Sequence, residues 1–256
     1  MDKNKKNKMI GFGLAVAVAS IIGGIAVGKK IKNIKDEKNL QQSIYKTGAV
    51  RKFGTFYLNG VKKKLPIDFD DFEDIPNYEE GNIEIRDTDR NDEYKLSWIE
   101  VMEDEKKLLI CDRNILKNVS WNELNDQGLV YGKVVKLDGR KYILRLLTGG
   151  NGKLKSNVVS EWDKYIRNID DILELPESTE ADLKDATDDS CFEQQNGDSN
   201  RLWNWYKFCS FTQSNYYISD RFSVIRGFYS VASIHYANKE KKYDTIGYRP
   251  VLELLE

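Results

Sequence analysis

The C-terminal stretch 201–256 constrains the fold of this chain more than any other part of the sequence. Its apolar residues come in short runs broken by glycine, as in RFSVIRGFYS and IGYRPVLELLE, and two tryptophans stand two residues apart in RLWNWYKF. Short runs rich in β-branched and aromatic residues, bounded by turn residues, are typical of β-strands. We therefore expect a β-rich C-terminal part whose aromatic side chains supply much of the core.

Three β-hairpins are predicted upstream of that stretch, each as two apolar runs joined by a short polar turn. They cover residues 53–65, turning at Asn59-Gly60, residues 95–112, turning at 103–105, and residues 132–147, turning at Asp138-Gly139. Asn-Gly and Asp-Gly favour the primed two-residue turns whose twist matches that of paired strands. The acidic stretch 66–90 is expected to form a loop.

Two helices are expected within this β-rich chain. Ser120, followed three residues later by Glu123, forms a capping box that predicts a short helix. Residues 156–169 show a helical period that places five apolar residues on one face, namely Val158, Trp162, Tyr165, Ile166 and Ile169. Residues 170–198 are rich in Asp and Glu and are expected to form a solvated loop with at most a short helical turn.

Residues 9–27 form an uncharged apolar segment, MIGFGLAVAVASIIGGIAV, which as a helix would be about 28 Å long. That length matches the hydrocarbon core of a bilayer, and lysines at positions 3, 5, 6 and 8 and at 29, 30, 32 and 35 flank the segment. We expect a transmembrane helix that remains as a signal anchor. The alternative is a signal peptide that is cleaved after the small residues Ala26-Val27-Gly28.

These segments divide the chain into a basic tail (1–8), a transmembrane helix (9–28), a polar stalk (29–48), a small β-hairpin region (49–112) and a C-terminal domain (113–256). The expected fold class is α+β, mostly irregular antiparallel β with two helices, preceded by one transmembrane helix. A short basic tail before a first apolar segment usually stays in the cytoplasm, whereas the slight excess of lysines after the segment favours the opposite orientation. We expect a single-pass protein of the cell membrane with an extracellular C-terminal domain.

Composition narrows the classes of function. The formal net charge is −1, so we expect no nucleic-acid partner. The single histidine, His235, excludes a site that needs two or three histidine ligands. The three cysteines match neither a disulfide framework nor a zinc pattern. Either Cys111, Cys191 and Cys209 are all small buried residues, or Cys191 and Cys209 form one bridge in an exported domain.

A series of short motifs follows in the second half of the chain. They read Val119-Ser120-Trp121, Arg145-Leu146-Leu147-Thr148, Glu161-Trp162, Asn200-Arg201-Leu202-Trp203-Asn204-Trp205, Phe222-Ser223-Val224-Ile225-Arg226-Gly227 and Gly247-Tyr248-Arg249. In this order they resemble the formylglycine-generating enzyme, or sulfatase-modifying factor, family over residues 108–253. The resemblance implies a C-type lectin-like domain at 113–256, since that family's fold is a variation on the C-type lectin fold. The closing GYRPVLEL also resembles bacterial, often phage-associated, proteins built on the same fold.

The chain departs from this family where its enzymes are similar to one another, in a cysteine pair that binds copper. The corresponding region here, residues 228–238, reads FYSVASIHYAN and contains no cysteine, and Cys209 lies upstream of it. A soft metal ion needs the thiolate pair. The resemblance therefore implies a catalytically degenerate member without formylglycine chemistry and without a copper cofactor.

Without the chemistry of the family's enzymes, the remaining function is ligand binding. Lectin-type folds carry their binding sites on loops over a rigid core. We expect residues 228–242 to bind a glycan or a protein. The candidate ligand-binding residues are Tyr229, Ser230, Ser233, His235, Tyr236 and Asn238, and Tyr216, Tyr217 and Tyr243 are candidates to join them by stacking. One alternative is that alternate residues here are strand core. For the whole protein, the alternatives are a structural, phage-derived envelope component or an enzyme with unassigned residues.

Eight residues are expected to be structural, namely Trp121, Trp162, Trp203, Trp205, Arg226, Gly227, Gly247 and Arg249. Tryptophans fill the core of an irregular β domain, a buried arginine has five donors for loop carbonyls, and glycine permits close backbone approach. We assign no metal ligand and expect no cofactor. Calcium remains open because the acidic loop offers hard oxygen ligands, at Asp188, Asp189, Asn196, Asp198 and Asn200.

Overall fold

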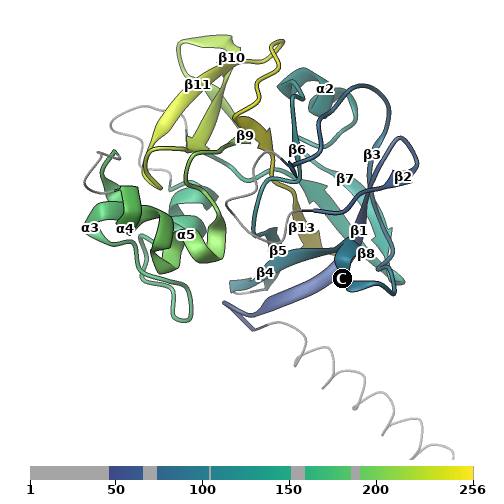
Figure 1. The fold of residues 1–256 in the computed structure, drawn as a ribbon, viewed down its shortest axis with the longest axis horizontal. Coiled ribbons are helices and arrows are strands. Elements are labelled where there is room, and N and C mark those ends of the chain that lie inside the picture. The colour runs from purple at the N-terminus through teal and green to yellow at the C-terminus, as the bar shows by residue number, and fades with distance from the viewer. Residues whose placement is uncertain (1–45, 66–73, 104, 151–158, 186–190, 256) are drawn as a thin grey trace, which may run out of the picture. The chain divides into compact units, whose positions relative to one another are not determined.

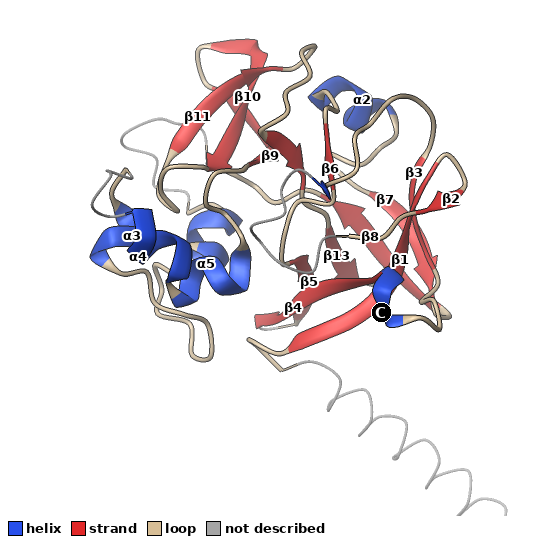
Figure 2. Ribbon diagram, viewed as in Figure 1, coloured by secondary structure: helices blue, strands red, loops and turns tan. Residues whose placement is uncertain are grey.

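Two mostly antiparallel β-sheets and a few short helices build the computed structural model (Figures 1 and 2). The structure describes residues 46–65, 74–103, 105–150, 159–185 and 191–255, which belong to the unit Lys46–Glu256. The expected tail, the transmembrane helix and most of the stalk lie outside these residues. No helix within the described ranges is long and apolar enough to cross a membrane. The mixture of antiparallel strands and short helices agrees with the expected α+β class.

The larger sheet runs in the order β2-β1-β4-β5-β13-β8-β7, and β3 also pairs with β1. Its strands are β1 (Val50–Leu58), β2 (Val61–Lys62), β3 (Ile83–Arg86), β4 (Lys95–Glu103), β5 (Lys106–Cys111), β7 (Lys133–Leu137), β8 (Arg140–Arg145) and β13 (Val251–Leu254). The last described strand, β13, therefore lies inside this sheet and joins β5 to β8.

The hairpins β1–β2, β4–β5 and β7–β8 confirm the three that the sequence predicts. Asn59 and Gly60 have φ of +53° and +76°, and Asp138 and Gly139 have φ of +47° and +83°. A primed turn needs positive φ at both of its central residues, which Asn, Asp and Gly adopt most readily. Local turn chemistry thus sets these registers.

The smaller sheet runs in the order β11-β10-β9-β12-β6. Its strands are β6 (Leu116–Lys117), β9 (Cys209–Tyr216), β10 (Ser219–Gly227), β11 (Ile234–Asn238) and β12 (Ile246–Tyr248). Along the described strands the chain passes between the two sheets four times, from β5 to β6, from β6 to β7, from β8 to β9 and from β12 to β13. Arg249 and Pro250 make the last of these passages.

The helix α2 (Trp121–Asp126) begins at the predicted capping box: Ser120 accepts from the Glu123 amide, and the Glu123 carboxylate accepts from the Ser120 amide. The prediction of a helix over 156–169 is wrong in extent. Within its described part, 159–169, only a π-type turn over Trp162–Ile166 forms, preceded by Glu161. Trp162, Tyr165 and Ile166 are buried as the period predicts, but Ile169 lies past the turn and is exposed.

The acidic stretch 170–198 is not the solvated loop that its composition indicates. It holds α3 (Glu180–Leu183) and α4 (Cys191–Asn196), and α5 (Asp198–Trp203) begins at its end. Asp182 closes a capping box with Thr179, and both Asp182 and Gln194 are fully buried. Composition does not predict the burial of these two polar side chains, because it depends on hydrogen bonds that they form with backbone groups in the folded chain.

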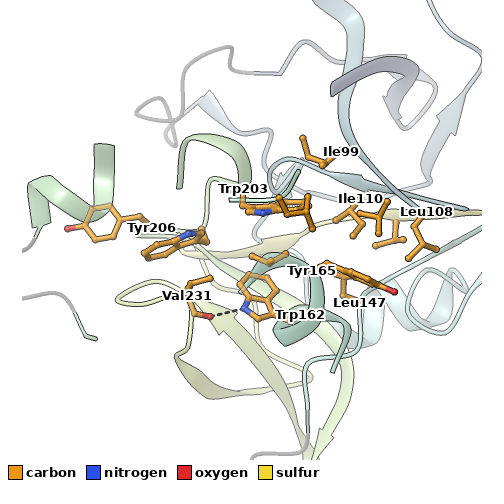
Figure 3. Packing of buried hydrophobic residues seen from close by; sticks show 14 residues of the cluster. Ile99, Leu108, Ile110, Leu147, Trp162, Tyr165, Trp203, Tyr206 and Val231 are labelled. Carbon is orange, nitrogen blue, oxygen red and sulfur yellow. Dashed lines mark hydrogen bonds between the residues drawn. The ribbon is translucent and has the colours of Figure 1, made fainter. Parts of the chain in front are cut away.

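The core contains a cluster in which tryptophans from the π-type turn Trp162–Ile166, from the end of α5 and from the loop after α5 meet the larger sheet (Figure 3). The cluster consists of Ile99, Val101, Leu108, Ile110, Leu147, Trp162, Tyr165, Ile166, Leu175, Trp203, Trp205, Tyr206, Val231 and Val251. The indole N–H of Trp162 donates to the carbonyl of Val231 at 2.8 Å, a bond that also ties the segment after β10 to the core. Trp121, also buried, donates its indole N–H to the carbonyl of Thr212.

Candidate ligand-binding surface

Three tyrosine rings meet at the solvent-exposed end of the smaller sheet. Tyr216 ends β9, Tyr217 stands in the turn to β10, and Tyr236 lies on β11, on the other side of β10. The ring centroids of Tyr216 and Tyr236 are 3.9 Å apart, and those of Tyr216 and Tyr217 are 5.1 Å apart. Tyr217 is 54% exposed and Tyr236 39%. We call these three residues the tyrosine cluster.

Two isoleucines extend the apolar surface beside the tyrosine cluster. Ile218, next to Tyr217 in the turn, is 65% exposed, and Ile234, two residues before Tyr236 on the same face of β11, is 37% exposed. Exposed aromatic and aliphatic side chains that are neighbours in a turn or on one face of a strand form a patch, and such patches mark interaction sites more often than isolated apolar residues do. Sequence reasoning did not select Ile218 or Ile234, because nothing local shows that β9 and β11 flank the same strand.

A second exposed aromatic group lies where the chain leaves β10. Gly227 and Phe228 have φ of +93° and +89°, which turns the backbone sharply. The turn exposes Tyr229 (48%), whose ring packs against Phe228 with centroids 4.5 Å apart and lies 6.4 Å from the ring of His235. Nε2 of His235 is buried and has no hydrogen-bond partner among the described residues. Tyr229 therefore presents an exposed aromatic ring, whereas Nε2 of the neighbouring His235 is not accessible to a ligand in this structure.

The remaining predicted binding residues shape the segment instead of facing solvent freely. Ser230 is buried and donates to the carbonyl of Asp182. Ser233 donates to the carboxylate of Asp185, and the Asn238 side chain accepts from the amide of Glu240. Their polar atoms already have partners within the chain.

Tyr243 is tied to β11 as well, because its hydroxyl accepts the Asn238 amide at 3.1 Å. Of the residues proposed to join the surface by stacking, Tyr216 contacts Tyr236 directly, Tyr217 contacts Tyr216, and Tyr243 braces the end of β11.

Arg226 anchors the buried end of β10 beneath this surface. Its guanidinium binds both carboxylate oxygens of Asp163, at 2.7 and 3.1 Å, and donates to the carbonyls of Gly149 and Ser233. Burial by itself raises the pKa of Asp163, but hydrogen bonds from Arg226 and Ser160 and the Arg226 charge outweigh it and lower the pKa overall. Arg226 therefore fixes the segment that carries Tyr229 and His235.

Arg249 performs the same task at the passage between the two sheets, without binding a carboxylate. It donates to the carbonyls of Cys111, Asp112, Trp203 and Asn204 and to the hydroxyl of Ser210. Burial lowers the pKa of its guanidinium to about 10, so it still carries its charge at neutral pH. The Arg249 guanidinium thus holds backbone and Ser210 of the protein itself.

The glycines expected to be structural lie against backbone. A Cβ on Gly227 would lie 3.0 Å from the Trp205 carbonyl oxygen, and one on Gly247 would lie 2.5 Å from that of Leu116. Both distances are shorter than ordinary contacts, so no larger residue fits without displacement of the chain.

All three cysteines are free thiols, so the alternative of a Cys191–Cys209 bridge does not hold in this structure. Cys111 and Cys209 are buried, and burial raises the pKa of each thiol to about 12. A thiol with such a pKa is protonated at neutral pH and is not a nucleophile. Cys191 is half-buried and hydrogen-bonded with Tyr206.

The described residues among those considered for calcium are engaged elsewhere in the fold. Asn200 is buried, and its side chain accepts from the amides of Trp205 and Tyr206 and donates to the carbonyl of Gln195. Its oxygen thus completes the turn after α5 and is not free for an ion. Asn196 caps its own helix and Asp198 pairs with Arg201, whereas positions 188 and 189 lie outside the described residues. Across the described ranges, no group of three or more His, Cys, Asp or Glu side chains could hold a metal ion.

A pocket of about 280 Å³ lies away from the tyrosine cluster, beside β1 and β4. Its walls carry charges of both signs, and several are paired with one another. Lys95 lies 2.5 Å from Asp92, and Arg113 lies 2.9 Å from Asp112. Because its wall charges neutralise one another, the pocket presents no net charge to select a ligand.

No protein-family model, no curated protein and no solved structure matches the chain.

Proposed function

We propose that this chain is a membrane-anchored, non-catalytic binding protein whose C-type lectin-like domain takes a carbohydrate ligand at the tyrosine cluster. The anchor is the apolar segment 9–28, and the domain stands outside the cell. The degenerate relationship to the sulfatase-modifying factor family rests on the ordered motifs of residues 108–253. A protein ligand at the same surface is the second candidate.

The exposed contact of Tyr216, Tyr217 and Tyr236 is the observation that carries the proposal. A tyrosine buries large apolar area with few rotatable bonds, and its face stacks on the apolar face of a sugar ring while its hydroxyl reaches a partner. Exposed rings that already hold one another lose little rotamer freedom on binding, so less of the binding free energy is spent on ordering side chains.

The chemistry of the described residues supports binding over catalysis. The buried thiols are protonated, Arg226 and Arg249 are occupied by carbonyls or by Asp163, and the histidine contacts Tyr229 without a nearby nucleophile among the described contacts. A nucleophile and a base within hydrogen-bond reach of each other are the usual signature of covalent catalysis. Among the described residues, Ser160–Asp163 and Ser233–Asp185 place a hydroxyl beside a carboxylate, but Asp163 is held by Arg226, and the described contacts bring no histidine to either pair.

A glycan array probed with the full chain in detergent tests the proposal. We expect the wild-type chain to bind a subset of glycans and the Y217A/Y236A chain to lose at least about tenfold in affinity, as loss of stacking at a hot spot does. Tyr131, an exposed tyrosine that packs on Trp121, supplies the matched control, and Y131A should bind as wild type does.

Three outcomes would oppose this function. Equal loss in Y131A would show a general effect of tyrosine removal. Unchanged binding by Y217A/Y236A would place the site elsewhere. Absence of any glycan bound by the wild-type chain would favour a protein ligand or the structural, phage-derived envelope role.

A further inference from the structure

The strand β11 is an edge of the smaller sheet, since β10 is its single neighbour in the sheet order. An edge strand presents unpaired backbone N–H and C=O groups, and folded proteins usually blunt such edges with charge, proline or a covering segment. The sequence of β11, IHYAN, contains no charged residue and no proline. Two of its side chains, Ile234 and Tyr236, are exposed and apolar.

The hydrogen bonds around β11 identify which of its residues face outward. The Lys239 amide donates to the carbonyl of Arg221 on the β10 side, whereas the Asn238 amide donates to the hydroxyl of Tyr243 on the other side. Successive residues of a paired strand alternate between the two sides. Ile234 and Tyr236 therefore point their backbone groups away from β10, and no hydrogen bond from another described residue reaches those groups.

We propose that β11 is a self-association edge, at which two copies of this chain pair their β11 strands antiparallel about a two-fold axis at His235. In this register Ile234 of each copy lies opposite Tyr236 of the other. Both are outward-facing residues, so each pair exchanges two backbone hydrogen bonds. The symmetric arrangement closes with two subunits, and the two smaller sheets become one continuous sheet.

The side chains that meet in this register are complementary. Ile234 and Tyr236 form an aliphatic–aromatic cross-strand pair, which is among the favourable pairings in antiparallel sheets. No like charges within β11 oppose each other. A peptide from another protein could bond to the same backbone groups. Only a second copy of this chain forms two symmetry-related pairs of Ile234 with Tyr236.

The charges at the two ends of β11 favour the same partner. The start of the strand carries Asp185, which is held by the Ser233 hydroxyl. The other end leads into residues 239–242, which comprise three lysines and one glutamate. Antiparallel pairing places the acidic end of each copy beside the basic end of the other, which steers two copies into this orientation.

Cysteine cross-linking of the full chain in detergent tests the register directly. At the two-fold axis, His235 of both copies forms a non-hydrogen-bonded pair with Cα atoms about 4.5 Å apart, which suits a disulfide. H235C in a C191S background should form a disulfide-linked dimer under mild oxidation. The two native thiols that remain, Cys111 and Cys209, are buried.

The matched control moves the cysteine along the same edge. In this register Asn238 lies opposite Ala232, so two introduced thiols at 238 are about 20 Å apart. We expect at least about tenfold less linked dimer for N238C than for H235C. Adding I234K to the H235C chain should reduce the yield similarly, because an edge lysine blocks strand pairing.

The oligomeric state of the chain without any introduced cysteine is an independent test of the proposed dimer. Sedimentation of the wild-type chain should show a dimer that I234K converts to a monomer, while Y217A leaves the dimer intact. Equal cross-linking of H235C and N238C, or a wild-type monomer at all concentrations, would overturn the proposal. Glycan binding by a monomeric chain would leave the proposed function standing and remove this inference alone.

Discussion

The two ends of the β9–β10 hairpin differ in almost every respect, although the same two strands build both. At the end that holds Cys209 and Gly227, both strands are buried and Arg226 is fully enclosed. At the turn, Tyr217 and Ile218 are exposed and meet solvent beside Tyr236. At the buried end, the polar groups of Arg226 are hydrogen-bonded within the chain. At the turn, apolar side chains are left uncovered by the described part of the chain.

This difference separates residues that hold the surface from residues that form it. Arg226 bonds Asp163, Gly149 and Ser233, and so fixes the segment on which Tyr229 and His235 stand. Substitution at the buried end should therefore reduce the free energy of unfolding and lower binding only through unfolding. Substitution at the turn should reduce binding and leave stability nearly unchanged.

The largest effect is expected from R226M. It removes the buried cation that binds both oxygens of Asp163, so that only the longer pair with Arg167, at 3.7 Å, remains, and it leaves two carbonyls without their donor. Breaking a buried ion pair costs about 3–5 kcal/mol. Urea unfolding of the full chain measures it. Arg221, exposed on the same strand, provides the control, and R221M should change the free energy of unfolding by less than about 0.5 kcal/mol.

Removing both partners sharpens the same comparison. The double variant D163L/R226M should recover a large part of the stability lost in R226M, since no charge is then buried unpaired. A double variant as unstable as R226M would indicate that the carbonyl bonds of Arg226, and not its pairing with Asp163, hold the buried end.

The next effect is expected from G227A, at about 2–3 kcal/mol. The added methyl would lie 3.0 Å from the Trp205 carbonyl oxygen, and φ is +93° at this position. Gly60 also has positive φ but has no atom within 4 Å of its Cβ position. G60A should therefore cost only about 1 kcal/mol, the conformational part of the penalty. Equal losses would remove the backbone contact from the explanation.

The pH dependence of stability should distinguish Arg226 from Arg249. The pKa of Asp163 in the folded chain lies below its ordinary value of 3.8, so its pairing with Arg226 stabilises the fold above that pH. This contribution is lost as the pH falls below about 3.8 through the folded value. Arg249 binds no carboxylate, so its bonds persist in acid.

Unfolding measured between about pH 5 and about pH 2 checks this sign. Wild type should lose more stability than D163L/R226M over that range, while the loss caused by R249M should be the same at both ends of it. A difference between wild type and the double variant that does not change with pH would contradict the assignment of the lowered pKa to this pair.

The smallest effect on stability is expected from Y217A. The side chain is more than half exposed and its ring touches only the neighbouring Tyr216 among the ring contacts described, so its removal should cost no more than about 0.5 kcal/mol. Thermal unfolding measures this change. A loss as large as that of G227A would mean that the tyrosine cluster belongs to the core of the sheet.

Sequence reasoning succeeded where the cause of a structure is local. The pairs Asn59-Gly60 and Asp138-Gly139 predict turns because their own φ preferences decide the hairpin. The helix of residues 121–126 was equally readable, since its start depends on Ser120 and Glu123 alone.

Reasoning failed where distant contacts decide. The helical period of 156–169 correctly predicts that Trp162 and Tyr165 are buried. The turn itself is short, and it is held in place by long-range contacts such as the bond between Asp163 and Arg226. The candidate site shows the same limit. Tyr236 was selected from sequence, whereas its contact with Tyr216 depends on the strand order β11-β10-β9, which no local pattern encodes.

The most direct test of the account is a paired measurement of glycan binding and thermal unfolding on the full chain and on Y217A/Y236A. The account predicts that the variant unfolds within about 2 °C of wild type, as expected for a stability change of less than about 0.5 kcal/mol in a domain of this size, and loses the glycans that the wild type binds. A variant that keeps those glycans would contradict the claim that the tyrosine cluster is the binding surface.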